Sequence, residues 1–408
     1  MASDDAGLIG RRQFLTRGAL AGAGLVMAPS VIAACSTGTA SKAPSAAPSA
    51  APSVAITPNL STSLKEFKPF APSDKTGTKP PVPNVFVYSI PEASEYFNGL
   101  SKAAETAAKE RGIQYDGEVI SDGDPVKNID QLNQLLQKGI GGIWIQPEDS
   151  PAQGVVIEKG IPQGVCMVFS GHPATIQGMA DQYDLGYQQA LGAVQWIKDN
   201  LGGKATVMNF ILDHIEILIP RRQGTLDALK TGGAGITILE QELQKINTDE
   251  GFEFASTALQ AHPEINVWIG PDDTVLGVDA FLKSKSKDPA KEKVLATGLN
   301  GTDAGLAALK SNKSFIRQIY GFNSNLIGYA IGNYMADWFL GKQVPQVIQG
   351  RGVAVLSPAD VDTFNALIKD YKAGYTALQG GDTGKGLAAW GAINYDTRMN
   401  YTKNAITG

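Results

Sequence analysis

The feature that most constrains the fold is a regular alternation between short apolar runs and amphipathic segments, which starts at Val85. The first unit pairs a strand over Val85–Ser89 with a helix over Ser94–Arg111, which stops at Gly112. The same rhythm repeats as far as a strand over Phe315–Tyr320. Near-continuous apolar strands separated by amphipathic helices are typical of parallel sheets covered by helices on both faces. We therefore predict an α/β fold with right-handed crossover connections.

These units are too many for one open sheet with a single switch point, which favours two Rossmann-like lobes. The break falls near Asp181–Leu185, where a long helix begins the second lobe. A helix over Asn323–Leu340 and a strand over Val353–Leu356 follow the completed second lobe, so we expect several strands to cross between the lobes as a hinge. The segment after Leu356 suggests no role beyond bracing the hinge or the second lobe. The predicted N-terminal lobe comprises 84–183 and 323–350, and the predicted C-terminal lobe comprises 184–322 and 351–408.

The N-terminus has the pattern of an export signal. Arg11 and Arg12 precede the weakly apolar segment Ala19–Ala34, which is followed by Cys35. Twin arginines in this position indicate a twin-arginine translocation signal, and Ile32–Cys35 resembles a bacterial lipobox. The alternative is a membrane-spanning anchor, but the segment is shorter than the roughly 20 apolar residues that a span needs. We predict that residues 1–35 are a lipoprotein signal, and that acylated Cys35 holds the protein outside the cytoplasmic membrane.

Residues 36–83 have the composition of a tether. This segment is dominated by Pro, Ala, Ser, Thr and Lys. Such a sequence buries too little apolar surface to offset its chain entropy. We predict a disordered, Pro-stiffened spacer that holds the globular body away from the bilayer.

The bulk composition excludes some partners. The formal net charge is −5, and no basic cluster interrupts the globular part, which argues against a nucleic-acid partner. The chain has two cysteines. If Cys35 is acylated, Cys166 has no partner for a disulfide, and its apolar neighbours predict a small buried residue.

Motifs of enzymes on α/β folds are missing from the sequence. Ser89–Glu92 stands where a Gly-rich dinucleotide fingerprint would follow the first strand. There is no G-x-S-x-G elbow and no spaced set of metal ligands. We expect no enzymatic activity and no cofactor, although a metal site from Asp213, His214 and Glu216 is an alternative that adjacent side-chain directions disfavour.

Several short motifs in fixed order carry a resemblance to a known family. They are Glu95–Leu100 at the start of the first helix, Gly160–Pro162 before the fourth strand, Ala261–Ile265 before another strand, Asp272–Asp273, and Gly298–Thr302. From about Val85 to Leu356 the chain resembles periplasmic sugar-binding proteins of the ribose and galactose type, the receptor components of ABC importers. The resemblance implies two lobes that close on a ligand by hinge bending and deliver it to a membrane permease.

The resemblance also implies where ligand contacts lie. Tyr96 and Phe97 match an aromatic pair that stacks on the sugar, with a helix-core role as the alternative. Ser94 matches a polar contact or serves as a helix N-cap. Ligands of open α/β sheets lie outside the carboxyl ends of the strands. The predicted ligand-binding residues are Ser94, Tyr96, Phe97, Phe169, Ser170, Asp213, His214, Asp272, Asn300 and Phe322.

The chain departs from the family pattern at most charged positions. Phe169-Ser170 replaces an Asp-Arg pair, Asn300 replaces an Asp, and Ile219 stands where a ligand-clamping Arg is expected. Arg221 and Arg222 lie close enough to substitute for that Arg. Because a buried polar site loses affinity when its partners are removed, we expect a more aromatic and less charged cleft that is not specific for ribose or glucose.

The leading hypothesis is a monomeric, extracytoplasmic solute-binding receptor of an ABC importer, which binds a sugar or a related polyol. A sensory receptor for an autoinducer or a nucleoside, which signals to a membrane partner, remains open because import and sensing both use lobe closure. An α/β enzyme is a remote alternative. The export signal and the missing DNA-binding helices exclude a cytoplasmic repressor of the same fold.

Overall fold

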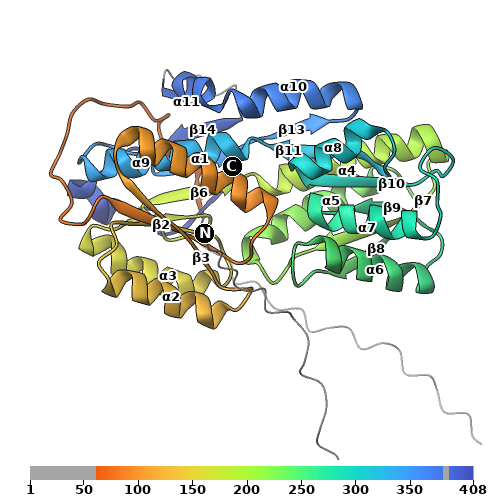
Figure 1. Ribbon diagram of the computed structural model, residues 1–408, viewed down its shortest axis with the longest axis horizontal. Coiled ribbons are helices and arrows are strands. Elements are labelled where there is room, and N and C mark those ends of the chain that lie inside the picture. Colours follow the sequence, from red (N-terminus) through yellow and green to blue (C-terminus); the bar gives the residue numbers. More distant parts are fainter. Residues whose placement is uncertain (1–60, 380–385, 408) are drawn as a thin grey trace, which may run out of the picture. The chain divides into compact units, whose positions relative to one another are not determined.

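A computed structural model of the chain describes residues 61–379 and 386–407, which form two α/β lobes (Figure 1). The prediction of two lobes built on mainly parallel sheets is confirmed. In the N-terminal lobe the strands are parallel except for the edge pair β12–β14. The seven-stranded sheet has the order β14 (Leu387–Trp390), β12 (Val347–Gly350), β6 (Ile176–Ala180), β5 (Cys166–Phe169), β4 (Gly142–Ile145), β2 (Val85–Ile90) and β3 (Gln114–Ile120).

The C-terminal lobe repeats this plan with one antiparallel edge pair, β11–β13. Its six-stranded sheet has the order β13 (Gly352–Val355), β11 (Ile316–Phe322), β10 (Leu295–Asn300), β9 (Ile265–Ile269), β7 (Ala205–Ile211) and β8 (Ile236–Glu242). Its helices are α4 (Gln182–Leu201), α5 (Ile219–Lys230), α6 (Thr248–Ala261), α7 (Asp272–Ser284), α8 (Asp303–Ser311) and α10 (Pro358–Lys369).

Alternating side chains build the two layers of the C-terminal lobe. Val207 and Val267 pack with α4 and α5 on one face of the sheet. Their neighbours Met208 and Trp268 pack on the opposite face with α7 and α8. This period of two is what a strand buried on both faces requires.

The N-terminal lobe is covered by α1 (Glu95–Arg111) and α9 (Ser324–Phe339) on one side of its sheet and by α2 (Pro125–Gln137) and α3 (Ser150–Gly160) on the other (Figure 1). Helix α1 starts at Ser94, whose hydroxyl accepts a hydrogen bond from the Phe97 N–H at 3.3 Å. It ends at Gly112, which adopts a φ of 67°. Its first turn thus lies just beyond the carboxyl end of β2.

The carboxyl ends of the strands are aligned along one edge of each sheet. Ser89 of β2 lies opposite Ile145 of β4, and Ile145 lies opposite Phe169 of β5. In the other lobe, Asn209 of β7 lies opposite Ile269 of β9. The loops that follow these strands are therefore the ones that meet between the lobes.

Two glycines bring α4 and α5 unusually close together. A Cβ atom on Gly186 would lie 2.0 Å from the Arg221 carbonyl oxygen, and one on Gly224 would lie 2.0 Å from the Tyr183 carbonyl oxygen. Any larger residue would push the helices apart. This contact fixes the N-terminal turn of α5, which carries Arg221.

Within the described residues the chain passes between the lobes after β6, after β11 and after β12. It passes once more between α10, which packs on α8 and β13, and α11 (Tyr371–Gln379), which packs on α9 and β14. Figure 1 shows α10 and α11 along the upper edge of the two lobes.

The C-terminal segment corrects the predicted lobe boundary. Residues 351–408 were expected in the C-terminal lobe, but α11 and β14 belong to the N-terminal lobe. The reason is aromatic packing: Tyr371 and Tyr375 of α11 meet Tyr329 of α9 edge-on, with ring centroids 5.2 and 5.5 Å apart. Strand β14 then adds to the edge of the N-terminal sheet.

The predicted spacer also differs from the structure in its last part. Phe70 is buried, and its N–H donates to the Ala389 carbonyl at 2.9 Å. The Thr78 N–H donates to the Asp396 carboxylate at 2.9 Å. Strand β1 (Ser61–Ser63) pairs in parallel with β15 (Ala405–Thr407). Residues 64–83 are thus part of the folded body, whereas the signal 1–35 and the rest of the spacer to residue 60 lie outside the described residues.

Two further features bear on the sequence predictions. Cys166 is fully buried, as predicted, and burial raises the pKa of its thiol. In the part of the chain that the structure describes, no helix has the length and apolar character that a membrane crossing requires.

Candidate functional site

A cavity of about 650 Å³ lies between the two lobes, at the carboxyl ends of their strands. The loops after β2 and β4 supply its N-terminal wall, and the loops after β7 and β8 supply its C-terminal wall. Its volume falls within the range of about 300–1,000 Å³ that is usual for small-molecule sites. This is the place where open α/β sheets bind ligands.

Aromatic side chains line the N-terminal wall. Trp144 stacks on Tyr88 with ring centroids 3.8 Å apart and planes 15° apart. Phe97 meets Tyr88 edge-on at 6.3 Å, and Tyr96 meets Phe97 edge-on at 5.4 Å. Tyr96 is the more exposed member of the predicted pair. Burial raises the pKa of Tyr96 to about 12, so its hydroxyl remains protonated and can donate a hydrogen bond.

Two polar side chains of the same wall hold unused acceptor atoms. Gln177 is buried, and its Nε2 donates to the Gly171 carbonyl at 2.7 Å, while its Oε1 has no partner among the described residues. Glu148 Oε2 accepts from the Ser121 hydroxyl at 2.7 Å, while its Oε1 lacks a described partner. Burial raises the pKa of Glu148 to about 7. Both residues line the cavity, and both oxygens are buried acceptors without a described partner.

Arg221 is the main polar group of the C-terminal wall. Its Nε and Nη2 donate to Gln182 Oε1 at 2.9 and 2.6 Å, and no carboxylate among the described residues forms an ion pair with it. Burial lowers the pKa of Arg221 to about 10, which leaves the guanidinium charged at neutral pH. The remaining donor hydrogens are available to a solute in the cavity.

An aliphatic loop completes this wall. Ile215, Ile217 and Leu218, which follow β7, line the cavity with partly exposed side chains. They occupy the region where the family resemblance implied a ligand-clamping Arg. The C-terminal wall therefore combines an aliphatic loop with the Arg221 guanidinium, and Lys245 and Asp273 also line it.

The two lobes already touch at the mouth of the cavity. The Ile246 N–H, next to the start of α6, donates to Glu92 Oε1 at 2.8 Å. The Ala304 N–H, in the first turn of α8, donates to Glu95 Oε2 at 3.3 Å. Both carboxylates come from the loop after β2 or the start of α1, and both interact with the positive ends of helices. Burial raises the pKa of Glu92, and burial with nearby Glu95 raises the pKa of Asp273 to about 6.

This arrangement of two lobes around one cleft has a counterpart among known families. The model of the periplasmic binding protein domain matches residues 85–343. The chain belongs to this family. It is therefore an extracytoplasmic solute-binding protein, which agrees with the predicted class and with the prediction of a non-enzymatic receptor.

Three known proteins are similar to this periplasmic binding protein over most of their length. Ribose import binding protein RbsB of Bacillus subtilis (strain 168) is 27% identical over 268 residues, which cover 62% of this chain and 80% of that protein. A twin-arginine translocation pathway signal protein from Burkholderia phytofirmans has a TM-score of 0.62 at 19% identity, covering 72% of this chain and 95% of the other. An ABC transporter solute binding protein from Bacillus halodurans C-125 with bound myo-inositol has a TM-score of 0.60 at 17% identity, covering 72% of this chain and 99% of the other. Both solved structures have the same fold as this chain.

Most of the residues that were predicted to bind ligand line the cavity of this binding protein. Ser94 does so although its hydroxyl also caps α1. Asn300 ends β10 with a φ of 132°, a conformation that is rare outside glycine and that often marks functional sites. The predicted residues that line the cavity are Ser94, Tyr96, Phe97, Ser170, His214, Asn300 and Phe322.

Phe169 and Asp272 are corrections, because their side chains are directed into the structure. Phe169 is fully buried at the end of β5, a strand that is covered on both faces. Asp272 is also fully buried, and its Oδ2 accepts a hydrogen bond from the Thr302 N–H at 2.7 Å. Burial raises the pKa of Asp272 to about 7. This carboxyl holds the turn between β10 and α8.

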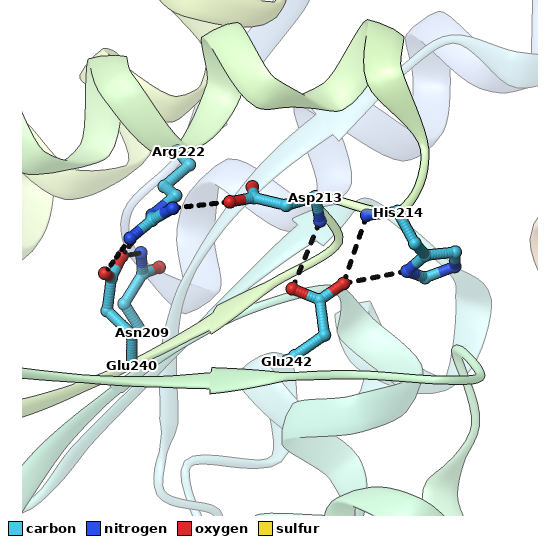
Figure 2. A network of polar contacts seen from close by, with 6 residues as sticks. All are labelled: Asn209, Asp213, His214, Arg222, Glu240 and Glu242. Atoms are coloured by element: carbon cyan, nitrogen blue, oxygen red, sulfur yellow. Dashed lines mark hydrogen bonds and ion pairs between the residues drawn. The ribbon is translucent and has the colours of Figure 1, made fainter. Parts of the chain in front are cut away.

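Asp213 is a third correction, and Figure 2 shows the reason. The Arg222 guanidinium bridges the carboxylates of Asp213 and Glu240. Its Nη2 and Nε donate to Glu240 at 2.5 and 2.8 Å. Glu240 and Asp213 both raise the pKa of Arg222. His214 Nδ1 lies 2.8 Å from Glu242, so the network ties the loop after β7 to β8 (Figure 2).

The alternative of a metal site at this loop is not supported. Asp213 and His214 have separate partners, Arg222 and Glu242. No group of three or more His, Cys, Asp or Glu side chains within 61–379 and 386–407 is placed to hold a metal ion.

The sequence interpretation missed several residues that line the cavity. Gln177 lies on β6, a strand that the apolar periodicity did not reveal because Gln and Gly interrupt it. Trp144 lies within β4, and Glu148 follows this strand. Their position at or beyond the carboxyl end of β4 was the one available signal. Arg221 had been considered only as a substitute for the missing clamp.

The raised pKa of Glu148 predicts a pH effect on stability. Between its ordinary pKa of 4.5 and its folded value of about 7, the folded protein binds more protons at this group than the unfolded chain does. The free energy of unfolding therefore falls as pH rises through this window. We expect Glu148→Gln to lose less stability than the wild type between pH 5 and pH 8 in urea unfolding. Glu158→Gln, at an exposed glutamate of α3, should keep the wild-type dependence. An unchanged dependence in Glu148→Gln would contradict the assignment.

Proposed function

We propose that this protein is the receptor of an ABC importer for a sugar or a related polyol, which it binds as a monomer in the cleft and delivers to a permease. The observation that carries the proposal is the composition of the cavity. Arg221 holds unused donors, Gln177 holds an acceptor without a described partner, and Tyr96 presents a partly exposed aromatic ring. Hydroxyl groups of a polyol suit Arg221 and Gln177, and the apolar C–H face of a sugar ring suits Tyr96. The ribose import protein of Bacillus subtilis and the myo-inositol-bound protein of Bacillus halodurans support this class of solute.

A thermal-shift panel tests the proposed solute class. The full chain would be heated with D-ribose, D-galactose, D-allose, D-glucose, myo-inositol and glycosides of these sugars. A solute present at 100 times its Kd should add about 2.7 kcal/mol to the free energy of unfolding. At least one of these compounds should therefore raise the melting temperature in a saturable way. The absence of a shift with every one of them would contradict the proposal.

We further propose that the protein is exported by the twin-arginine route and anchored by lipid on Cys35. The Arg11–Arg12 pair and the lipobox-like Ile32–Cys35 support this proposal. Expressed in a host with a lipoprotein pathway, the wild type should sediment with membranes, and Cys35→Ser should be released into the soluble fraction. Cys166→Ala is the matched control, because this buried cysteine should not affect membrane association. Retention of Cys35→Ser in the membrane fraction would refute the lipid anchor.

A further inference from the structure

We infer that the solute of this cleft is a glycoside whose second half is an apolar, ring-sized group, rather than a free sugar. The inference rests on the proposed function and makes it more specific. It comes from three properties of the cavity: its volume in a structure whose lobes already touch, the aliphatic loop in one wall, and the apolar side chains that the segments near the hinge add beyond the polar groups.

The first property is size. The cavity measures about 650 Å³, although Glu92 and Glu95 of one lobe already hydrogen-bond to Ile246 and Ala304 of the other. The volume is therefore that of a cleft whose lobes are already in contact at its mouth. Sites of this size usually enclose most of a drug-sized molecule. A single sugar ring would leave much of the space to water.

The second property is the chemistry of the C-terminal wall. Ile215, Leu218 and Ile246 line the cavity and also pack against the core of their lobe. Ile217 lines the cavity and is part of no hydrophobic cluster that the described residues form. A partly exposed isoleucine that packs in no core cluster loses further apolar surface to water-free contact when an apolar solute covers it. The C–H faces of a sugar ring cover such a surface only in part, whereas an apolar group covers it without burying hydroxyl groups.

The third property is the pattern of polar groups. Atoms without a partner among the described residues occur in Arg221, Gln177, Glu148 and Asp273, all of which line the cavity. Farther along the cavity, the segments near the hinge add Phe322, Ile327 and Ile406, which are apolar. The lining therefore has enough hydrogen-bonding capacity for one sugar ring and enough apolar surface for a second, hydrophobic group.

Calorimetric titration of the full chain with matched pairs tests the inference. The pairs are D-glucose with phenyl β-D-glucopyranoside, D-galactose with phenyl β-D-galactopyranoside, and D-ribose with adenosine, with phenol as the aglycone alone. In at least one pair the glycoside should bind about tenfold more tightly than its parent sugar, or more, as apolar groups in complementary pockets do. The third pair distinguishes a nucleoside from an O-glycoside. Phenol alone should bind much more weakly than the preferred glycoside.

The outcomes separate this inference from the proposed function. If sugars bind but in every pair the parent sugar binds as tightly as its glycoside or more tightly, the inference is overturned and the proposed function stands. If no sugar, polyol or glycoside binds, the inference and the proposed function both fail. If phenol binds as tightly as the glycosides, the sugar ring is not recognised, and both again fail.

A variant of the aliphatic wall provides the second test. Ile217→Ser removes the apolar surface at a residue outside the hydrophobic core, so the lobe should fold normally. It should lower the affinity for the preferred glycoside about tenfold and lower the affinity for the parent sugar by a clearly smaller factor. Leu191→Ser, at an exposed leucine of α4 away from the cavity, is the matched control and should change neither. Equal losses for glycoside and parent sugar in Ile217→Ser would overturn the assignment of this wall.

Discussion

Replacing Arg221 with alanine is expected to weaken solute binding by about 10- to 150-fold, because hydrogen bonds to charged groups contribute about 1.5–3 kcal/mol. The guanidinium lies in the cleft, donates to Gln182, and has no carboxylate partner among the described residues. Its loss removes the one cation that the start of α5 presents to the solute. The effect should appear in the Kd measured by calorimetry, with little change in the melting temperature of the solute-free protein.

The adjacent Arg222 offers a matched control for this prediction. Its guanidinium is engaged by Asp213 and Glu240 rather than by the cavity (Figure 2). Arg222→Ala should lower stability while leaving the Kd within about twofold of the wild type, because rim and surface ion pairs contribute little to binding. Equal losses of affinity in both variants would show that Arg221 acts only through the fold of the loop after β7.

The second large effect concerns Asp272, where the expected loss is of stability rather than of binding. Its buried carboxyl accepts from the Thr302 N–H, and Gly298 and Gly305 pack against it. Asp272→Ala leaves a buried donor without a partner and opens a small void, which should cost about 2–4 kcal/mol of unfolding free energy. Chemical denaturation measures this loss directly.

Asp272→Asn separates the role of shape and hydrogen bonding from the role of charge. Burial raises the pKa of Asp272 to about 7, so the turn accepts a neutral side chain of the same shape. The asparagine should retain most of the stability that alanine loses, and both variants should bind solute with the wild-type Kd once folded. A loss of affinity at full stability in either variant would restore Asp272 to the binding site.

Much of the fold could be predicted from the sequence because apolar periodicity is local. The strand over Val85–Ser89 and the helix over Ser94–Arg111 agree with β2 and α1 within a few residues. The course of the C-terminal segment could not be predicted, because it depends on contacts between distant residues. Tyr371 is directed to the N-terminal lobe by Tyr329, a partner that no local pattern reveals.

The candidate site shows the same limit at the scale of side chains. The position of a residue at a strand end was predictable, but the direction of its side chain was not. Tyr96 faces the cavity, whereas Phe169 faces the core and Asp213 faces Arg222. In the same way, Gln177 belongs to the site through β6, a strand with too few apolar residues to be recognised.

The most direct test of the account is a fluorescence titration that reports from inside the cleft. Trp144 is the one tryptophan of the chain's five that lines the cavity within the described residues. A solute found in the thermal-shift panel should cause a saturable change in wild-type emission. Trp144→Phe should lose that change while calorimetry still detects binding, and Arg221→Ala should shift the midpoint of the wild-type curve to higher concentration. Two results together would contradict the account: a saturable emission change that persists in Trp144→Phe, and a titration midpoint that is unaltered in Arg221→Ala. They would place the solute outside the cleft.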